Sequence, residues 1–306
     1  MTRHHLLVFG LFLSFCQIVV AQSTASNAKV FSSDSIPFKV TSHNNLVIKA
    51  ILNQEDTLNL MFHTAASGVT LIEEASKRIN TVKWQEGDKV QSWGGAQDAR
   101  VSPLNTLQIG QFSWDSVTIW ENAYSGPETD GKFGPHLFEG WIMELNFDLG
   151  LLVLHQELPD MAAYEKVPLI LENGFLFMKG VSTLEGQDFP NQFLIHSGYG
   201  GTLLYDDGFV EESQIGKRIP ITDQKELKDS YGNVIKTLKG ALPKLSLGAL
   251  EFSDLPVGFF EGSIGRQKMS VLGGDLLKRM NLIFDVEKEA LYLKPSKWKG
   301  SGFKDS

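Results

Sequence analysis

The sequence has almost no cysteine, and it lacks the short motifs of several common enzyme classes. Cys16 is the one thiol, so no disulfide can form within the chain and its fold must be stabilised by packing. No Lys/Arg-rich block occurs and the formal net charge is −8, which gives nucleic-acid binding no electrostatic support. A glycine-rich phosphate loop of the usual spacing, a Cys-x-x-Cys pair and a Gly-x-Ser-x-Gly turn are also missing.

The N-terminus indicates export. Arg3 precedes an apolar run, Leu6–Val20, which is shorter than the roughly 20 residues of a membrane span. The small residues at Val19-Val20-Ala21 are suited to cleavage by a signal peptidase. We therefore predict a signal peptide at residues 1–21, a protein that is secreted or periplasmic, and no transmembrane segment.

The rest of the chain has the pattern of an all-β protein. Short apolar or alternating runs, bounded by Gly, Asn and Asp, predict one hairpin over residues 46–62 and another over 175–195. One short helix is expected at 71–79, where the apolar residues share a face, and another after Gly274.

A short motif recurs in the two halves. Residues 60–68 are Leu-Met-Phe-His-Thr-Ala-Ala-Ser-Gly, and residues 193–201 are Phe-Leu-Ile-His-Ser-Gly-Tyr-Gly-Gly. Each is an apolar strand followed by a histidine, a Thr or Ser, and a turn of small residues. Downstream, Lys132-Phe133-Gly134 parallels Val271-Leu272-Gly273. The repeat predicts two homologous lobes, at residues 22–155 and 167–294. A linker at 156–166 would connect them, and a polar tail would follow at 295–306.

These motifs resemble the Asp-Thr/Ser-Gly motif of the retropepsin-like and pepsin-like aspartic peptidases, of the type found among exported bacterial proteins. Each lobe in that family supplies one catalytic aspartate, and here the two positions hold His63 and His196. The resemblance implies an all-β fold of two aspartic-peptidase-like β-barrel lobes with a few short helices and a cleft between the lobes.

The same resemblance implies roles for the neighbouring residues. Thr64 and Ser197 would cross-link the two turns through hydroxyl hydrogen bonds, while Ala65 and Gly198 would occupy the glycine positions of the motif. The segment 90–101 would be the flap that covers the cleft, with Trp93, Gly94 and Gly95 near its tip.

The histidines remove the chemistry that is usual for this family. The reaction needs two carboxylates that share one proton, so that one of them acts as a base toward water. Two neutral imidazoles supply no fixed negative charge, and two protonated ones repel each other. We therefore predict a monomeric pseudoenzyme without a cofactor, which binds a peptide or protein in its cleft, because main-chain recognition of extended peptide survives the loss of catalysis.

Two other functions are compatible with the sequence. His63 and His196 would serve an exported hydrolase either as a general base or, with His136 as a third ligand, as a zinc site. In the remaining alternative the cleft is closed, and the protein is structural or binds a partner. His155 follows the last strand of the first half, and we expect it to be an ordinary exposed residue.

Overall fold

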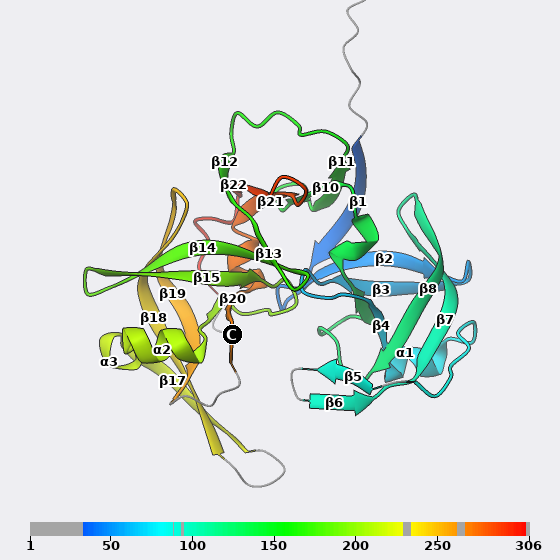
Figure 1. Ribbon diagram of the computed structural model, residues 1–306, viewed down its shortest axis with the longest axis horizontal. Helices are drawn as coiled ribbons and strands as arrows, with labels where there is room; N and C mark the ends of the chain where they lie inside the picture. The colour runs from blue at the N-terminus through cyan, green and yellow to red at the C-terminus, as the bar shows by residue number, and fades with distance from the viewer. Residues whose placement is uncertain (1–32, 88, 93–94, 229–233, 262–266, 304–306) are drawn as a thin grey trace, which may run out of the picture. The chain divides into compact units, whose positions relative to one another are not determined.

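The two hairpins predicted over residues 46–62 and 175–195 form long antiparallel ladders (Figure 1). β2 (Leu46–Leu52) pairs with β3 (Asp56–Phe62), and β14 (Phe175–Leu184) pairs with β15 (Gln187–Ile195). Buried residues alternate with more exposed ones along β2, because every second side chain of a strand points to the same face.

The computed structural model describes residues 33–303 except for 88, 93–94, 229–233 and 262–266. It describes only the backbone of 33, 89–92, 95–98, 225–228 and 234–235. All of the described residues belong to one unit of the chain, Phe31–Ser306.

Each lobe adds further strands and a few short helices to its hairpin. The first lobe has β4 (Val69–Ile72), α1 (Glu73–Arg78), β5 (Lys89–Ser92), β6 (Gly95–Asp98), β7 (Val101–Ile109), β8 (Phe112–Asn122), β9 (Gly131–Phe133) and the 3-10 helix η1 (Pro135–Phe138). The second lobe has β13 (Ile170–Glu172), β16 (Leu203–Leu204), α2 (Asp207–Ser213), α3 (Ile215–Arg218), β17 (Ile221–Lys228), β18 (Val234–Leu247), β19 (Leu250–Phe260), β20 (Ser270–Leu272) and α4 (Gly274–Leu277).

The two lobes have the same strand order. It runs β2-β3-β9-β4-β8-β7 in the first lobe and β14-β15-β20-β16-β19-β18 in the second. In both, the strand that leads into the histidine motif pairs in parallel with a short strand of the downstream repeat, β3 with β9 and β15 with β20. The repeated sequence thus folds twice into one arrangement.

Six strands drawn from both halves form a sheet that the lobes share. They are β1 (Ser33–Val40), β10 (Ile142–Asn146), β11 (Leu151–His155), β12 (Glu165–Pro168), β21 (Met280–Asp285) and β22 (Ala290–Pro295). Their order is β12-β22-β21-β10-β11-β1, and the antiparallel pairing of β10 with β21 joins the two halves. All six residues of β21 are buried, as expected for a strand covered on both faces.

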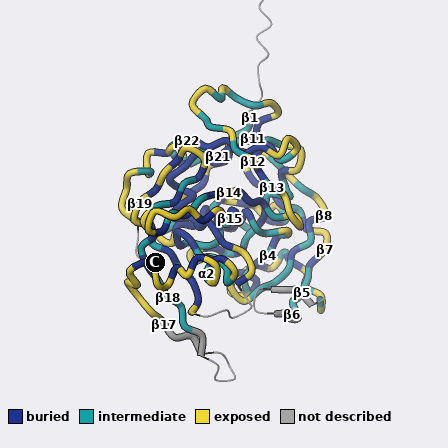
Figure 2. Tube along the Cα trace, turned by 60° about the vertical axis from the view of Figure 1, so that its left-hand side comes forward, coloured by how far each residue is buried: buried dark blue, intermediate teal, exposed yellow. Residues whose placement is uncertain are grey.

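The hydrophobic core supports the strands that carry the motifs. Phe62, Phe133, Phe193 and Phe259 are among its largest fully buried side chains. Figure 2 shows the buried residues concentrated along the strands, with most exposed residues in the connections. The ring of Phe62, which directly precedes His63, lies 5.4 Å from the ring of Phe133 on the neighbouring strand β9. Both strands are therefore fixed by packing at the point where the motif begins.

The helices differ most from the sequence-based expectation. The predicted helix over 71–79 covers only Glu73–Arg78, because Leu71 and Ile72 extend β4 and pair with β8. The second lobe contains two helices, α2 and α3, that the pattern did not predict. The prediction of an all-β protein with two lobes and a few short helices is confirmed. Within the described residues, no helix has the length and apolar character needed to cross a membrane.

Candidate functional site

The two histidines lie at equivalent places in the two lobes. His63 directly follows β3 and His196 directly follows β15. The backbone N–H of His63 donates to the carbonyl of Phe133 at 2.9 Å, and that of His196 donates to the carbonyl of Leu272 at 2.9 Å. Each histidine is thus held by the short strand that comes from its own downstream repeat.

The hydroxyl groups of Thr64 and Ser197 join the two motif turns. The Thr64 N–H donates to Ser197 Oγ at 3.0 Å, and the Ser197 N–H donates to Thr64 Oγ1 at 3.0 Å. Each hydroxyl also donates across the lobes, Thr64 to the carbonyl of Ile195 at 2.6 Å and Ser197 to the carbonyl of Phe62 at 2.7 Å. The four bonds are buried and symmetric, so they fix the distance between the turns.

Two asparagines that directly precede β2 reinforce this connection. The amide of Asn45 donates to the carbonyls of Ser197 and Gly198, both at 3.3 Å, and the amide of Asn44 donates to the carbonyl of Gly200 at 2.8 Å. Neither asparagine belongs to a recognisable motif, so nothing in the sequence indicated their role.

The imidazoles of His63 and His196 face each other. Their ring centroids are 4.5 Å apart, with 58° between the ring planes. His63 is 9% exposed, and His196 is partly buried. A Cβ atom at Gly198 would come within 2.2 Å of the His63 ring, so the close approach of the first imidazole requires glycine at this position.

The two glycine positions of the motif differ in the room available for a side chain and not in backbone conformation. Neither Ala65 nor Gly198 has a φ angle in the left-handed region. Ala65 packs against the small apolar cluster of Phe177, Leu194 and Val271. Alanine is therefore tolerated in the first turn, while glycine is needed in the second.

Each imidazole accepts a hydrogen bond from its own turn at the Nδ1 atom. The N–H of Ala65 donates to Nδ1 of His63 at 3.1 Å, and the N–H of Tyr199 donates to Nδ1 of His196 at 2.9 Å. A nitrogen that accepts a hydrogen bond carries no proton, so we assign the proton of each neutral ring to Nε2. Neither Nε2 atom has a hydrogen-bond partner among the described residues.

Burial keeps both imidazoles neutral at pH 7. The pKa of His63 lies well below 6.5, chiefly because the ring is buried. The charges of His196 and Lys132 lower this pKa further, and a hydrogen bond with its own backbone opposes the decrease. The pKa of His196 falls from 6.5 to about 4, again chiefly because of burial. A hydrogen bond with its own backbone opposes this decrease, and the charge of Lys132 adds to it. The pair is therefore uncharged over the physiological range.

Lys132 lies on the same face of the sheet as the first histidine. Phe133 is fully buried in the core, so the preceding Lys132 on β9 points to the opposite face. Its neighbour across the β3–β9 pair is Met61, which shares a face with His63 two residues later. Burial lowers the pKa of Lys132, and no carboxylate is paired with it among the described residues.

His136 does not join the two motif histidines. It lies in η1 and lines a cavity of about 610 Å³ together with Ala66 and Trp141. Its Nδ1 atom is buried with no hydrogen-bond partner among the described residues, and burial lowers its pKa. In the part of the chain that the structure describes, no group of three or more His, Cys, Asp or Glu side chains could hold a metal ion.

The flap predicted at residues 90–101 is described only in part. β5 and β6 form a two-stranded antiparallel hairpin in this region, and Gly95 is the first residue of β6. Trp93 and Gly94 lie outside the described residues. Their role over the histidine pair therefore stays a prediction.

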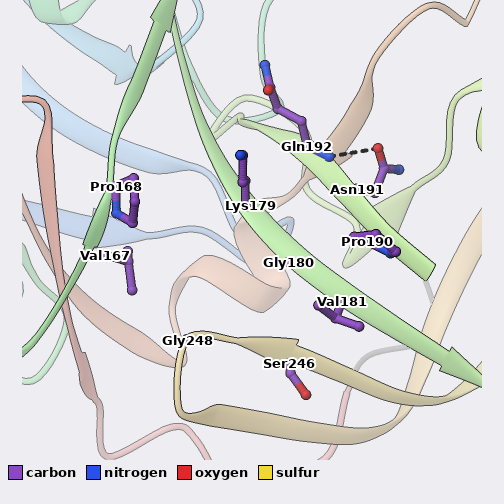
Figure 3. Close-up of a pocket in the computed structure, with 10 residues that line it drawn as sticks. All are labelled: Val167, Pro168, Lys179, Gly180, Val181, Pro190, Asn191, Gln192, Ser246 and Gly248. Carbon is purple, nitrogen blue, oxygen red and sulfur yellow. Dashed lines mark hydrogen bonds between the residues drawn. The ribbon is translucent and has the colours of Figure 1, made fainter. Parts of the chain in front are cut away.

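Further cavities lie in the second lobe. Figure 3 shows one of about 640 Å³ between β12, β14, β15 and the β18–β19 turn, with Lys179 as its one charged lining residue. The N–H of Gln192 donates to Oδ1 of Asn191 at 2.7 Å at its edge. Another cavity, of about 300 Å³, adjoins the second motif turn and is lined by Tyr199 and Lys239 among others.

Comparison with solved structures shows that other proteins share this fold. No family model and no curated protein matches the sequence. Among solved structures, the chain is similar to the aspartic proteinase from Irpex lacteus, with a TM-score of 0.58 and 12% sequence identity; the match covers 89% of this chain and 100% of that one. The all-β, two-lobed fold is therefore that of the aspartic peptidases, and at this level of identity the likeness shows the fold alone.

Proposed function

We propose that this protein is an aspartic-peptidase homologue that lacks both catalytic aspartates and binds extended peptide between its lobes without hydrolysing it. The observation that carries the proposal is the state of the histidine pair. His63 and His196 face each other at the place where the two motif turns meet, and the Nδ1 atom of each is bound by a backbone N–H.

We infer that neither histidine of the pair serves as a base for hydrolysis. Activation of a water molecule requires an acceptor within hydrogen-bond reach of it. The acceptor nitrogen of each imidazole is occupied by its own turn, and the other nitrogen carries the proton. The uncharged pair also supplies no negative charge to polarise a water molecule. Both points argue against a hydrolase that uses His63 or His196 as its general base.

The same tautomers argue against a zinc site. A histidine that binds a metal through Nε2 normally donates a hydrogen bond from its other nitrogen. Here the Nδ1 atoms of His63 and His196 accept hydrogen bonds instead, and His136 is not grouped with them. A metal ion at Nε2 would have to displace a proton and break the hydrogen bond with the turn.

Recognition of extended peptide can outlast catalysis. Edge strands and flaps bind peptides mainly through backbone hydrogen bonds, which do not depend on the residues of a catalytic dyad. The predicted signal peptide at residues 1–21 would place this binding activity in a periplasm or outside the cell.

The test is to measure binding and cleavage in the same samples. A fluorescent library of extended octapeptides is titrated with the purified protein from pH 3 to pH 8, and each sample is then examined for products by mass spectrometry. We expect binding without cleavage, and weaker binding by a Trp93→Ala variant. Trp298→Ala is the matched control, because Trp298 is an exposed tryptophan of the C-terminal segment. Cleavage that is lost in a His63→Ala variant would overturn the proposal.

A further inference from the structure

The histidine pair offers hydrogen-bond donors and no free acceptor. With Nδ1 of each ring bound by a backbone N–H, the Nε2–H groups of His63 and His196 are the polar groups left for a ligand. A pair of aspartates in the same turns would present acceptor oxygens instead. Replacement of both aspartates by histidine therefore reverses the hydrogen-bonding character of the site as well as removing its negative charge.

Lys132 adds a positive charge beside this pair. Its side chain is on the face that also carries Met61 and His63, and the ammonium group repels a proton on either imidazole. It makes no hydrogen bond or ion pair with the described residues, and burial lowers its pKa. A partly buried ammonium group without a counter-ion stabilises an anion brought close to it.

The second lobe has no equivalent charge. Lys132 precedes Phe133 and Gly134 in the first lobe, whereas Val271 precedes Leu272 and Gly273 in the second. Val271 packs into the apolar cluster that contains Phe177 and Leu194. A lysine is thus not needed for the packing of this repeat unit, and its presence in one lobe calls for another explanation.

We propose that His63, His196 and Lys132 form a carboxylate-binding subsite, so that the peptide bound between the lobes carries an acidic group at this point. The inference rests on the proposed function and specifies its ligand class. The carboxylate accepts a hydrogen bond from Nε2–H of each imidazole and pairs with the lysine ammonium. It belongs either to an Asp or Glu side chain or to the C-terminus of the peptide.

The experiment compares three peptide libraries that differ only in their carboxylates. One has a single internal Glu and an amidated C-terminus, the second has Gln in place of Glu, and the third has Gln with a free C-terminal carboxylate. We expect the native protein to bind one acidic library about tenfold more tightly than the neutral one, as for a charge-assisted hydrogen bond. The library that is preferred identifies the source of the carboxylate.

Variants at Lys132 test its part in this preference. Lys132→Val, which copies the second lobe, and Lys132→Met, which keeps the aliphatic stem, should both abolish the preference for the acidic library. Lys132→Arg should retain most of the preference. Lys179→Val is the matched control, because Lys179 is an exposed strand lysine that lines the separate cavity of Figure 3.

A small probe separates failure of the subsite from failure of peptide binding. Propionate is titrated into the protein while the imidazole signals of His63 and His196 are followed by nitrogen-15 NMR. Equal binding of acidic and neutral peptides would overturn the subsite and leave the proposed function intact. If no peptide binds, the proposed function fails, and the subsite is upheld only if propionate shifts both imidazole signals in the native protein but not in Lys132→Met.

Discussion

At the residue scale, the hydroxyl of Thr64 is held by two hydrogen bonds to the opposite lobe. It donates to the carbonyl of Ile195 and accepts from the N–H of Ser197, both in the opposite lobe, and Thr64 is 2% exposed. Thr64→Val keeps the shape of the side chain and leaves two buried backbone groups without a partner. We expect the free energy of unfolding to fall by about 2–4 kcal/mol in urea denaturation.

Two other threonine variants serve as controls for Thr64→Val. Thr64→Ser keeps the hydroxyl and should recover most of the lost stability. The Oγ1 atom of Thr70 is buried without a hydrogen-bond partner among the described residues. Thr70→Val should therefore be neutral or stabilising, and equal losses in the two valine variants would contradict the assigned role of Thr64.

The low pKa of His196 predicts a loss of stability in acid. The folded protein binds this proton only near pH 4, while the unfolded chain binds it near pH 6.5. The unfolded state therefore holds more protons between these values, and the free energy of unfolding falls as the pH decreases from 6.5 to about 4, by roughly 3 kcal/mol for this group. His63 acts in the same direction.

A difference measurement isolates this effect from the titration of carboxylates. His196→Asn keeps an acceptor for the N–H of Tyr199 but takes up no proton. Its stability should decrease less than that of the native protein between pH 6.5 and pH 4 in chemical denaturation. His43→Asn, at an exposed position, is the control. Parallel pH profiles for the native protein and His196→Asn would show that the imidazole is not held neutral by the fold.

The sequence alone was enough to find the residues of the site that occur twice. His63, His196, Thr64 and Ser197 stand out because the same pattern occurs in both halves. The sequence did not indicate Lys132 as a site residue, because it takes the place of an apolar residue in a segment that we expected to serve packing alone. A charged residue in one copy of an otherwise apolar repeat is the signal that would have drawn attention to it.

At the scale of elements, the sheet shared by the two lobes contains a buried polar network. Nε2 of His155 lies 2.8 Å from Oε2 of Glu144, and the hydroxyl of Tyr164 donates to Oε1 of the same carboxylate at 3.1 Å. Burial alone would raise the pKa of Glu144, but hydrogen bonds from His155, Asn146 and Tyr164 together lower it. The expectation that His155 is exposed is wrong: it is 9% exposed, because β11 lies between β1 and β10.

Removal of the charge from this network should weaken the shared sheet. In Glu144→Gln the carboxylate charge is lost, so the hydrogen bonds with the imidazole and the tyrosine hydroxyl are no longer charge-assisted. We expect a loss of about 2 kcal/mol in the free energy of unfolding, measured by urea denaturation. Glu172→Gln, at an exposed position on the neighbouring edge strand β13, should change it by less than about 0.5 kcal/mol. Equal stability of the two variants would mean that the network contributes little.

Strands were easier to predict than helices for a physical reason. The hairpins of β2–β3 and β14–β15 show their apolar pattern over many residues, and a turn marks the end of each strand. α2 and α3 have only 7 and 4 residues, so neither shows a helical period of useful length. Their positions depend on local capping, as where Oδ1 of Asp206 accepts from the N–H of Phe209 at 2.8 Å.

At the scale of the whole molecule, the duplication explains both the fold and the site. Two equal strand orders bring two equal turns together, and the shared sheet connects the lobes through β10 and β21. The residues on which catalysis depends can change while this framework remains. The tautomers of the histidine pair could not be foreseen, because they depend on backbone N–H groups that approach Nδ1 only in the folded turns.

We propose that the framework of an aspartic peptidase remains while its two histidines prevent catalysis. The most direct measurement compares cleavage of a mixed peptide library between pH 3 and pH 8 by the native protein and by the His63→Asp/His196→Asp double variant. We predict no cleavage by the native protein and cleavage in acid by the double variant, whose carboxylates would share a proton across the same two turns. Cleavage by the native protein that either single His→Ala substitution removes would contradict the account.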